Sequence, residues 1–109
     1  SLKLMYYFKA EKNLKEYIKK KNIPTHTIAS KYPMFYSEKY TSLLNSPKTL
    51  EFVENNDIKE ANYNYFIYTN ASNEFTASDM QYISNQMTLV KDFSEHQVEM
   101  KLYKRENIE

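Results

Sequence analysis

The sequence predicts an α/β fold: a small, mostly parallel sheet of three to four strands, covered by helices and ending in an antiparallel hairpin. Segments with helical apolar spacing alternate with short β-branched and aromatic runs, which is typical of parallel strands joined by helices. The end of the chain instead holds two β-segments separated by a short polar turn, the pattern of a hairpin. A length of 109 residues fits a single domain.

The first predicted element is an amphipathic helix over residues 4–21. Its C-terminal lysines suit the negative end of the helix dipole. The apolar positions that share its predicted buried face are Leu4, Tyr7, Phe8, Leu14 and Ile18. An alternative remains open, in which "LKLMYYF" is a strand, and Asn13 and Glu16 form the capping box of a shorter helix. Pro24 ends the helix in both cases, because proline disfavours helical geometry in the residue before it.

The middle of the chain predicts strand, helix and strand in that order. "THTIAS" (residues 25–30) is a short buried strand, and "KYPMFYSEKY" after it is a loop or a single helical turn. A helix is expected after Ser46-Pro47, where serine caps and proline takes the first helical position. Its apolar side holds Leu50, Phe52, Val53 and Ile58. "NYNYFIYTN" (residues 62–70) has the best β signal of the chain and is expected to be the central strand.

A last helix and a hairpin complete the prediction. In "FTASDMQYISNQM" (residues 75–87), Thr76 is the expected N-cap and Asp79 stands at the capping-box position. Met80, Ile83 and Met87 lie on one side of this helix. Residues 89–93 and 98–103 predict two strands joined by "SEHQ". In the second strand, Val98, Met100 and Leu102 alternate with polar neighbours, so one face is expected to be buried.

The composition excludes several classes of function. Without any glycine, the chain cannot build a P-loop or a dinucleotide fingerprint, and its turns must use Asn, Asp, Ser and Pro. Without cysteine, it forms no disulfide and no thiolate zinc site. No cofactor is therefore expected. No apolar run is long enough to span a membrane.

Charge is unevenly distributed although the net charge is only +1. Residues 1–22 hold seven Lys against two Glu, a local +5, whereas residues 51–79 hold six acids against one Lys, a local −5. The basic first helix suits either solvent or an anionic lipid surface. Nucleic acid is not an expected partner, although binding through residues 1–22 stays open as a weaker alternative.

No catalytic or metal-binding constellation is predicted. His26 and His96 lack the spacing that brings metal ligands together on one element. The carboxylates between residues 51 and 60 fall on the solvent side of the expected helix. No serine stands in a strand–turn–helix elbow, which normally needs flanking glycine.

Candidate contacts lie instead at the end of the first predicted strand. Ligands of parallel sheets bind beyond the carboxyl ends of the strands, and residues 31–36 occupy that position. The candidate binding residues are Lys31, Tyr32, Phe35, Tyr36 and Asn70. A lid that only seals the end of the sheet is an equal alternative. Asn70 also opens an N-glycosylation sequon, a pattern that arises often by chance in a chain rich in Asn and Ser.

Four short motifs carry a resemblance to a known family. They are "IASKYP" (residues 28–33), "YFIY" (65–68), "LVKDF" (89–93) and "LYKR" (102–105). In this order and over most of the chain, they resemble the soluble C-terminal domain of multi-spanning bacterial and archaeal membrane glycosyltransferases. These enzymes are of the dolichyl-phosphate-mannose–protein mannosyltransferase type and use polyprenyl-phosphate sugars as donors.

The resemblance implies a non-catalytic accessory domain on the extracytoplasmic face, because the catalytic acid of the family lies in the membrane portion. The implied partners are the membrane-embedded portion of the same chain and a lipid-linked sugar or acceptor. The local +5 of residues 1–22 favours the cytoplasmic side, which is the alternative location. The alternative function is a stand-alone cytoplasmic interaction or regulatory protein of the phage or mobile-element type.

Overall fold

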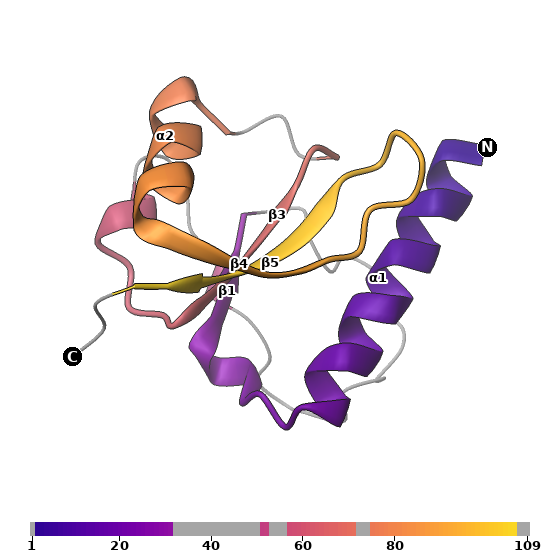
Figure 1. Cartoon of the computed structure of the whole chain (residues 1–109), viewed down its shortest axis with the longest axis horizontal. Coiled ribbons are helices and arrows are strands. Elements are labelled where there is room, and N and C mark those ends of the chain that lie inside the picture. The colour runs from indigo at the N-terminus through magenta and orange to yellow at the C-terminus, as the bar shows by residue number, and fades with distance from the viewer. Residues whose placement is uncertain (1, 32–50, 53–56, 72–74, 107–109) are drawn as a thin grey trace.

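A mixed β-sheet lies between two helices in the computed structural model, which describes residues 2–31, 51–52, 57–71 and 75–106 (Figure 1). The sheet has five strands in the order β2-β1-β3-β5-β4. The strands are β1 (Ile28–Ser30), β2 (Glu51–Phe52), β3 (Tyr65–Thr69), β4 (Met87–Asp92) and β5 (Met100–Arg105). The helices are α1 (Leu2–Lys20) and α2 (Ala77–Gln86), with short 3-10 turns η1 (Thr25–Thr27) and η3 (Asp57–Lys59).

The strand directions confirm the α/β class and the C-terminal hairpin but not a mostly parallel sheet. β1 pairs in parallel with β2 and with β3, whereas β5 pairs antiparallel with β3 and with β4. The prediction was wrong here because β5 returns from the hairpin and inserts beside β3, where Leu102 lies opposite Ile67. β3 is the central strand, as expected.

α1 confirms the helical interpretation of the N-terminal segment, and the alternative of a strand at "LKLMYYF" is wrong. The helix closes on Asn22, whose φ of 57° is left-handed. The Ile23 N–H donates to the Ile18 carbonyl, and the Asn22 N–H donates to the Lys19 carbonyl, each at 3.1 Å. Glycine usually takes this closing position, and asparagine is the common substitute, so the glycine-free chain ends its first helix as the composition predicts.

The helix predicted after Ser46-Pro47 is wrong where the structure describes it. Glu51–Phe52 is a strand that pairs with β1, and Asp57–Lys59 is a 3-10 turn. Parallel pairing with a distant segment supplies the backbone partners here, and no local pattern reveals it. Ile58 is nevertheless buried, as expected of the apolar side. Leu50 and Val53 lie outside the described residues.

The capping box predicted for the last helix is confirmed. The Thr76 hydroxyl accepts the Asp79 N–H, and the Asp79 carboxylate accepts the Thr76 N–H, both at 3.0 Å. Ile83 and Met87 are buried, but Met80 is 38% exposed, because the buried face of this short helix is narrower than the predicted one. In the hairpin, Val98, Met100 and Leu102 are buried as expected.

Each face of the sheet has its own hydrophobic cluster. On the α1 side, Ala10, Leu14 and Ile18 of the helix pack on Ile28, Ile67, Phe93, Met100 and Leu102. On the α2 side, Ile83 of the helix and Ile58 of η3 pack with Ala29, Tyr63, Phe66 and Met87. β1 is buried on both faces, as expected of a strand with helical cover on each side.

The first turns of α1 extend past the sheet (Figure 1). Leu4 and Phe8, predicted to face the core, are 52% and 46% exposed, because the buried residues of the cluster on this side begin at Ala10. Tyr7, predicted on the same face, is partly buried and packs against the cluster. In the part of the chain that the structure describes, no helix has the length and apolar character needed to cross a bilayer.

Arg105, at the end of β5, holds the segment around η3 in place. Its guanidinium donates to the carbonyls of Ala61 at 2.7 Å, Tyr63 at 3.3 Å and Ile58 at 3.3 Å, and also to the Lys59 carbonyl. It also lies 4.0 Å from the centre of the Tyr63 ring. Burial raises the pKa of Tyr63 above its ordinary value, against the opposing charge of the arginine.

Candidate functional site

Lys31 lies at the predicted carboxyl edge of β1, but its side chain points into the protein. It is 1% exposed, and its ammonium donates to the Asp79 carboxylate at 2.6 Å. The ammonium also lies 5.1 Å from the centre of the Phe75 ring. Lys31 therefore joins β1 to the N-terminus of α2, and a ligand contact at this residue stays a prediction.

Asn70 lies at the carboxyl end of β3 and is engaged with the hairpin turn. Its amide oxygen accepts the Glu99 N–H at 2.9 Å, and its amide nitrogen donates to the Gln97 carbonyl at 3.0 Å. Both polar atoms of the side chain thus have backbone partners. The other predicted contacts, Tyr32, Phe35 and Tyr36, lie outside the described residues. Of the predicted binding site, the structure therefore describes Lys31 and Asn70.

The hairpin turn connects this edge of the sheet to the start of α1. The His96 ring stacks on Tyr6 with 4.1 Å between centroids, and the Lys9 ammonium lies 3.7 Å from the Glu95 carboxylate. His96 has a φ of 55°, so a second polar residue takes the left-handed geometry that glycine would otherwise supply. The carboxyl end of β3, the turn and the first turns of α1 therefore lie at one end of the molecule.

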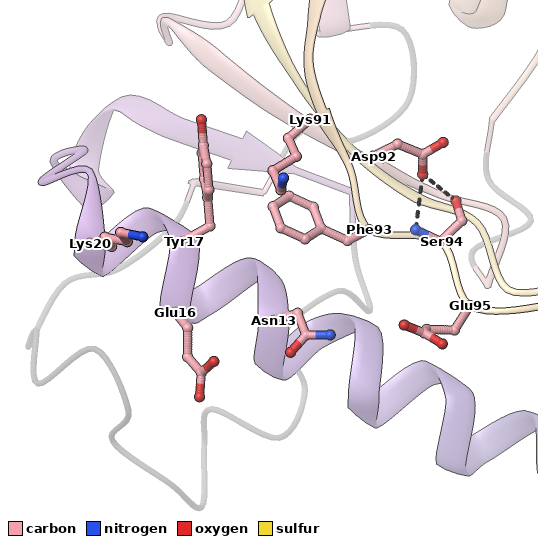
Figure 2. A pocket seen from close by; sticks show the side chains of 9 residues that line it. All are labelled: Asn13, Glu16, Tyr17, Lys20, Lys91, Asp92, Phe93, Ser94 and Glu95. Carbon is pink, nitrogen blue, oxygen red and sulfur yellow. Dashed lines mark hydrogen bonds between the residues drawn. The ribbon is translucent and has the colours of Figure 1, made fainter.

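A hollow of about 400 Å³ lies between α1 and the end of β4, and we call it the α1–β4 hollow (Figure 2). This volume is within the range of small-molecule sites. One stripe of α1 forms one wall, and the end of β4 with the residues directly after it forms the other. The lining residues are Asn13, Glu16, Tyr17, Lys20, Lys91, Asp92, Phe93, Ser94 and Glu95.

A β-bulge gives the hollow its inner wall. In a regular strand, residues 87 and 93 would share a face, since side chains alternate. Met87 instead belongs to the cluster on the α2 side and Phe93 to the cluster on the α1 side. The register shift between Leu89 and Lys91 accounts for this change of face. Lys91 and Phe93 consequently point toward α1, which sequence alternation alone could not reveal.

Two aromatic rings and a lysine form the floor of the hollow. Tyr17 and Phe93 meet edge to face with 5.5 Å between centroids. The Lys91 ammonium lies 5.7 Å from the centre of the Tyr17 ring and 6.0 Å from that of Phe93. Tyr17 is half-buried, whereas Phe93 is buried, so of the two rings it is mainly Tyr17 that remains accessible beside the cation.

One carboxylate at the rim is held in place by its neighbour. The Asp92 carboxylate accepts the Ser94 hydroxyl at 2.6 Å and the Ser94 N–H at 2.9 Å (Figure 2). The Ser94 hydroxyl in turn accepts the Met100 N–H at 3.1 Å. The hydrogen bonds from Ser94 lower the pKa of Asp92 although burial opposes the shift, so the carboxylate is ionised at neutral pH.

The chemistry of the lining suits binding. Among the described residues, no three Asp, Glu or His side chains come close enough to hold a metal ion. The lining combines three carboxylates, two ammonium groups, an amide and a phenol on an aromatic floor. A smaller hollow of about 180 Å³ beside α2 has no comparable aromatic floor; it is lined by Lys59, Ser78, Gln81, Tyr82, Asn85 and Gln86.

Comparison with protein-family models, with curated proteins and with solved structures finds no match to this chain.

Proposed function

We propose that this chain is a non-catalytic, extracytoplasmic accessory domain of a membrane glycosyltransferase that uses polyprenyl-phosphate sugars. In this proposal, the α1–β4 hollow positions a saccharide of the donor or of the acceptor. The four motifs that resemble the soluble domain of such enzymes support the assignment of the chain to a parent enzyme of this class. The lining of the hollow is the single observation from which we infer that the domain binds a saccharide.

The charge pattern of the hollow favours an uncharged, hydroxyl-rich ligand. An anion would meet the carboxylates of Glu16, Asp92 and Glu95, and a cation would meet the ammonium groups of Lys20 and Lys91. Hydroxyl groups can donate to the first set and accept from the second, so a saccharide uses both. Hydrogen bonds to charged groups are each worth about 1.5–3 kcal/mol, enough to orient a sugar ring.

The aromatic floor adds a surface for the apolar side of a sugar ring. Tyr17 supplies a ring next to polar partners, as small-molecule sites commonly do. The volume of about 400 Å³ accommodates one or two pyranose rings. The proposal therefore assigns binding to Asn13, Glu16, Tyr17 and Lys91, and assigns no bond-making step to the domain.

An NMR titration of the ¹⁵N-labelled chain with mannose, glucose, galactose and their disaccharides tests the hollow. We expect amide shifts confined to residues 13–20 and 91–95. Glu16→Ala removes an exposed carboxylate and is expected to weaken binding about ten-fold. Gln81→Ala, in the smaller hollow, is the matched control and should leave binding unchanged. Absence of shifts with every saccharide, or an equal loss in both variants, would refute a saccharide site.

The genomic reading frame tests the parent enzyme separately. We expect the frame upstream of Ser1 to encode several apolar segments of about 20 residues each, the length that crosses a bilayer. A start codon directly before Ser1 would contradict the membrane enzyme while leaving the saccharide titration to decide on the hollow.

A further inference from the structure

The start of α1 carries a concentration of exposed apolar side chains that the core does not use. Leu2 and Met5 are each 64% exposed, and Leu4 and Phe8 are 52% and 46% exposed. We call these four residues the α1 apolar patch. Among the described residues, the other large hydrophobic side chains of comparable exposure are Met80 on α2 and Leu89 on β4. The patch is therefore a local feature of this end of the molecule.

The charged residues within the first two turns of α1 are all positive. Lys3 and Lys9 lie within the same two turns, and residues 2–10 contain no acid. The Lys9 side chain is 64% exposed beside its contact with Glu95. The first acid of the helix, Glu11, is buried and lies 3.8 Å from the Lys15 ammonium. An anionic surface is thus the electrostatic complement of this end of α1.

Contacts behind the patch fix its orientation. Tyr6 is held by the stack with His96, and the Tyr7 hydroxyl donates to the Glu11 carboxylate at 3.2 Å. Both tyrosines are half-buried, so each has a ring partly packed on the protein and an edge at its surface. Tyrosines at the boundary between apolar and polar surroundings are typical of the interfacial region of a membrane.

The spread of the patch around the helix distinguishes a lipid surface from a protein groove. At 3.6 residues per turn, Leu4, Phe8, Met5 and Leu2 span an arc of about 160°. A groove that binds a helix usually takes a narrower stripe at i, i+3, i+4 and i+7. The boundary between lipid headgroups and acyl chains can accommodate a helix start with this wide apolar arc, because it needs no groove of complementary shape.

We infer that the first two turns of α1 insert into the interface of an anionic lipid bilayer, with Leu2, Leu4, Met5 and Phe8 among the acyl chains and Lys3 and Lys9 at the headgroups. This inference goes beyond the proposed function, because lipid binding holds whether or not the hollow takes a saccharide. The start of α1, which enters the interface, lies beside the hairpin turn between β4 and β5 (Figure 1). Asn70 donates to the Gln97 carbonyl of this turn.

Co-sedimentation of the 109-residue chain with vesicles tests the inference. The vesicles consist of phosphatidylcholine alone or of phosphatidylcholine mixed with phosphatidylglycerol. We expect partition into the mixed vesicles and little into the neutral ones. The double variant Met5→Ser/Phe8→Ser should lower the partition coefficient at least about ten-fold, because two large apolar side chains no longer enter the lipid. Lys3→Gln and Lys9→Gln should each lower it about five-fold.

The double variant Met80→Ser/Leu89→Ser is the matched control, since it removes two exposed apolar side chains, at 38% and 48% exposure, from other elements. It should bind vesicles like the unaltered chain. All variants change exposed positions, and circular dichroism checks that each remains folded. Equal losses in the two double variants, or equal partition into neutral and anionic vesicles, would overturn the inference. A concentration-dependent dimer that Met5→Ser/Phe8→Ser abolishes, without vesicle binding, would overturn it in favour of self-association.

Discussion

The buried ion pair between Lys31 and Asp79 supports the most direct prediction about stability. Both side chains are almost completely buried, at 1% and 2% exposure, and the charged atoms lie 2.6 Å apart. Lys31→Met removes the cation and keeps most of the side-chain volume. The Asp79 carboxylate then stays buried without the Lys31 ammonium. Removing only one member of a buried ion pair lowers stability strongly, because the other charge is left uncompensated.

The expected loss is about 3 kcal/mol in the free energy of unfolding. Breaking a buried pair by removing one partner typically costs about 3–5 kcal/mol. The lower end applies because Asp79 still accepts the Thr76 N–H at 3.0 Å and still benefits from the positive end of the α2 dipole. Domains of this size are stable by only about 5–15 kcal/mol, so the effect is large.

Urea unfolding of a double-mutant cycle measures the interaction. The cycle combines Lys31→Met, Asp79→Asn and the double variant, all at neutral pH. Because the double variant leaves neither charge buried, we expect it to lose at least about 1 kcal/mol less than the sum of the single losses. Strictly additive losses would refute the claim that these two groups stabilise each other.

The pH dependence gives a second readout of the same pair. Burial alone would raise the pKa of Asp79, but the hydrogen bonds from Lys31 and Thr76 outweigh it, and the folded protein holds this pKa below its ordinary value. The ionised carboxylate therefore stabilises the fold fully above the ordinary pKa of about 3.9. This contribution is lost as the pH falls below that value toward the lowered folded pKa. As the pH is lowered below about 3.9, the urea midpoint should accordingly fall more steeply for the unaltered chain than for Asp79→Asn.

Substitutions at three further positions have defined outcomes, each measured by urea unfolding. Asn22→Ala should destabilise the chain by about 1 kcal/mol because of the left-handed φ, whereas Asn22→Gly should not; equal effects would contradict the closure of α1 at this residue. Arg105→Met should cost about 3 kcal/mol, because several carbonyls around η3 lose a charged donor, and Arg105→Lys should recover only part of this loss. Asn70→Ala should cost about 1–2 kcal/mol, and an unchanged midpoint would argue against its two bonds to the hairpin turn.

Elements set by local chemistry were predictable from the sequence. The apolar spacing around Leu14 and Ile18 gives α1, and Thr76 with Asp79 gives the start of α2. The aromatic and β-branched run at residues 65–69 gives the central strand. In the two helices, the interactions that form the element lie within a few residues of one another, so a local pattern reveals them. The partners of the central strand are distant, but its aromatic and β-branched residues favour extended structure wherever the strand is placed.

Features set by distant partners were not predictable. β2 forms only because β1 is beside it, and its residues carry the signal of a helix that starts at Pro47. The bulge that turns Lys91 and Phe93 toward α1 leaves no trace in the alternation of the strand. The hollow combines α1 with β4, elements about seventy positions apart along the chain, so its lining could not be assembled from spacing alone.

The place of β5 constrains when the protein can fold during synthesis. This strand comes last among the elements described, yet it lies between β3 and β4 and supplies Met100 and Leu102 to the cluster beneath α1. During translation, the apolar face of α1 stays exposed to solvent until β5 has left the ribosomal exit tunnel and can pack against it. This domain therefore folds only after its whole length has been synthesised, and until then the nascent segment depends on its lysines, or on chaperones, to avoid aggregation.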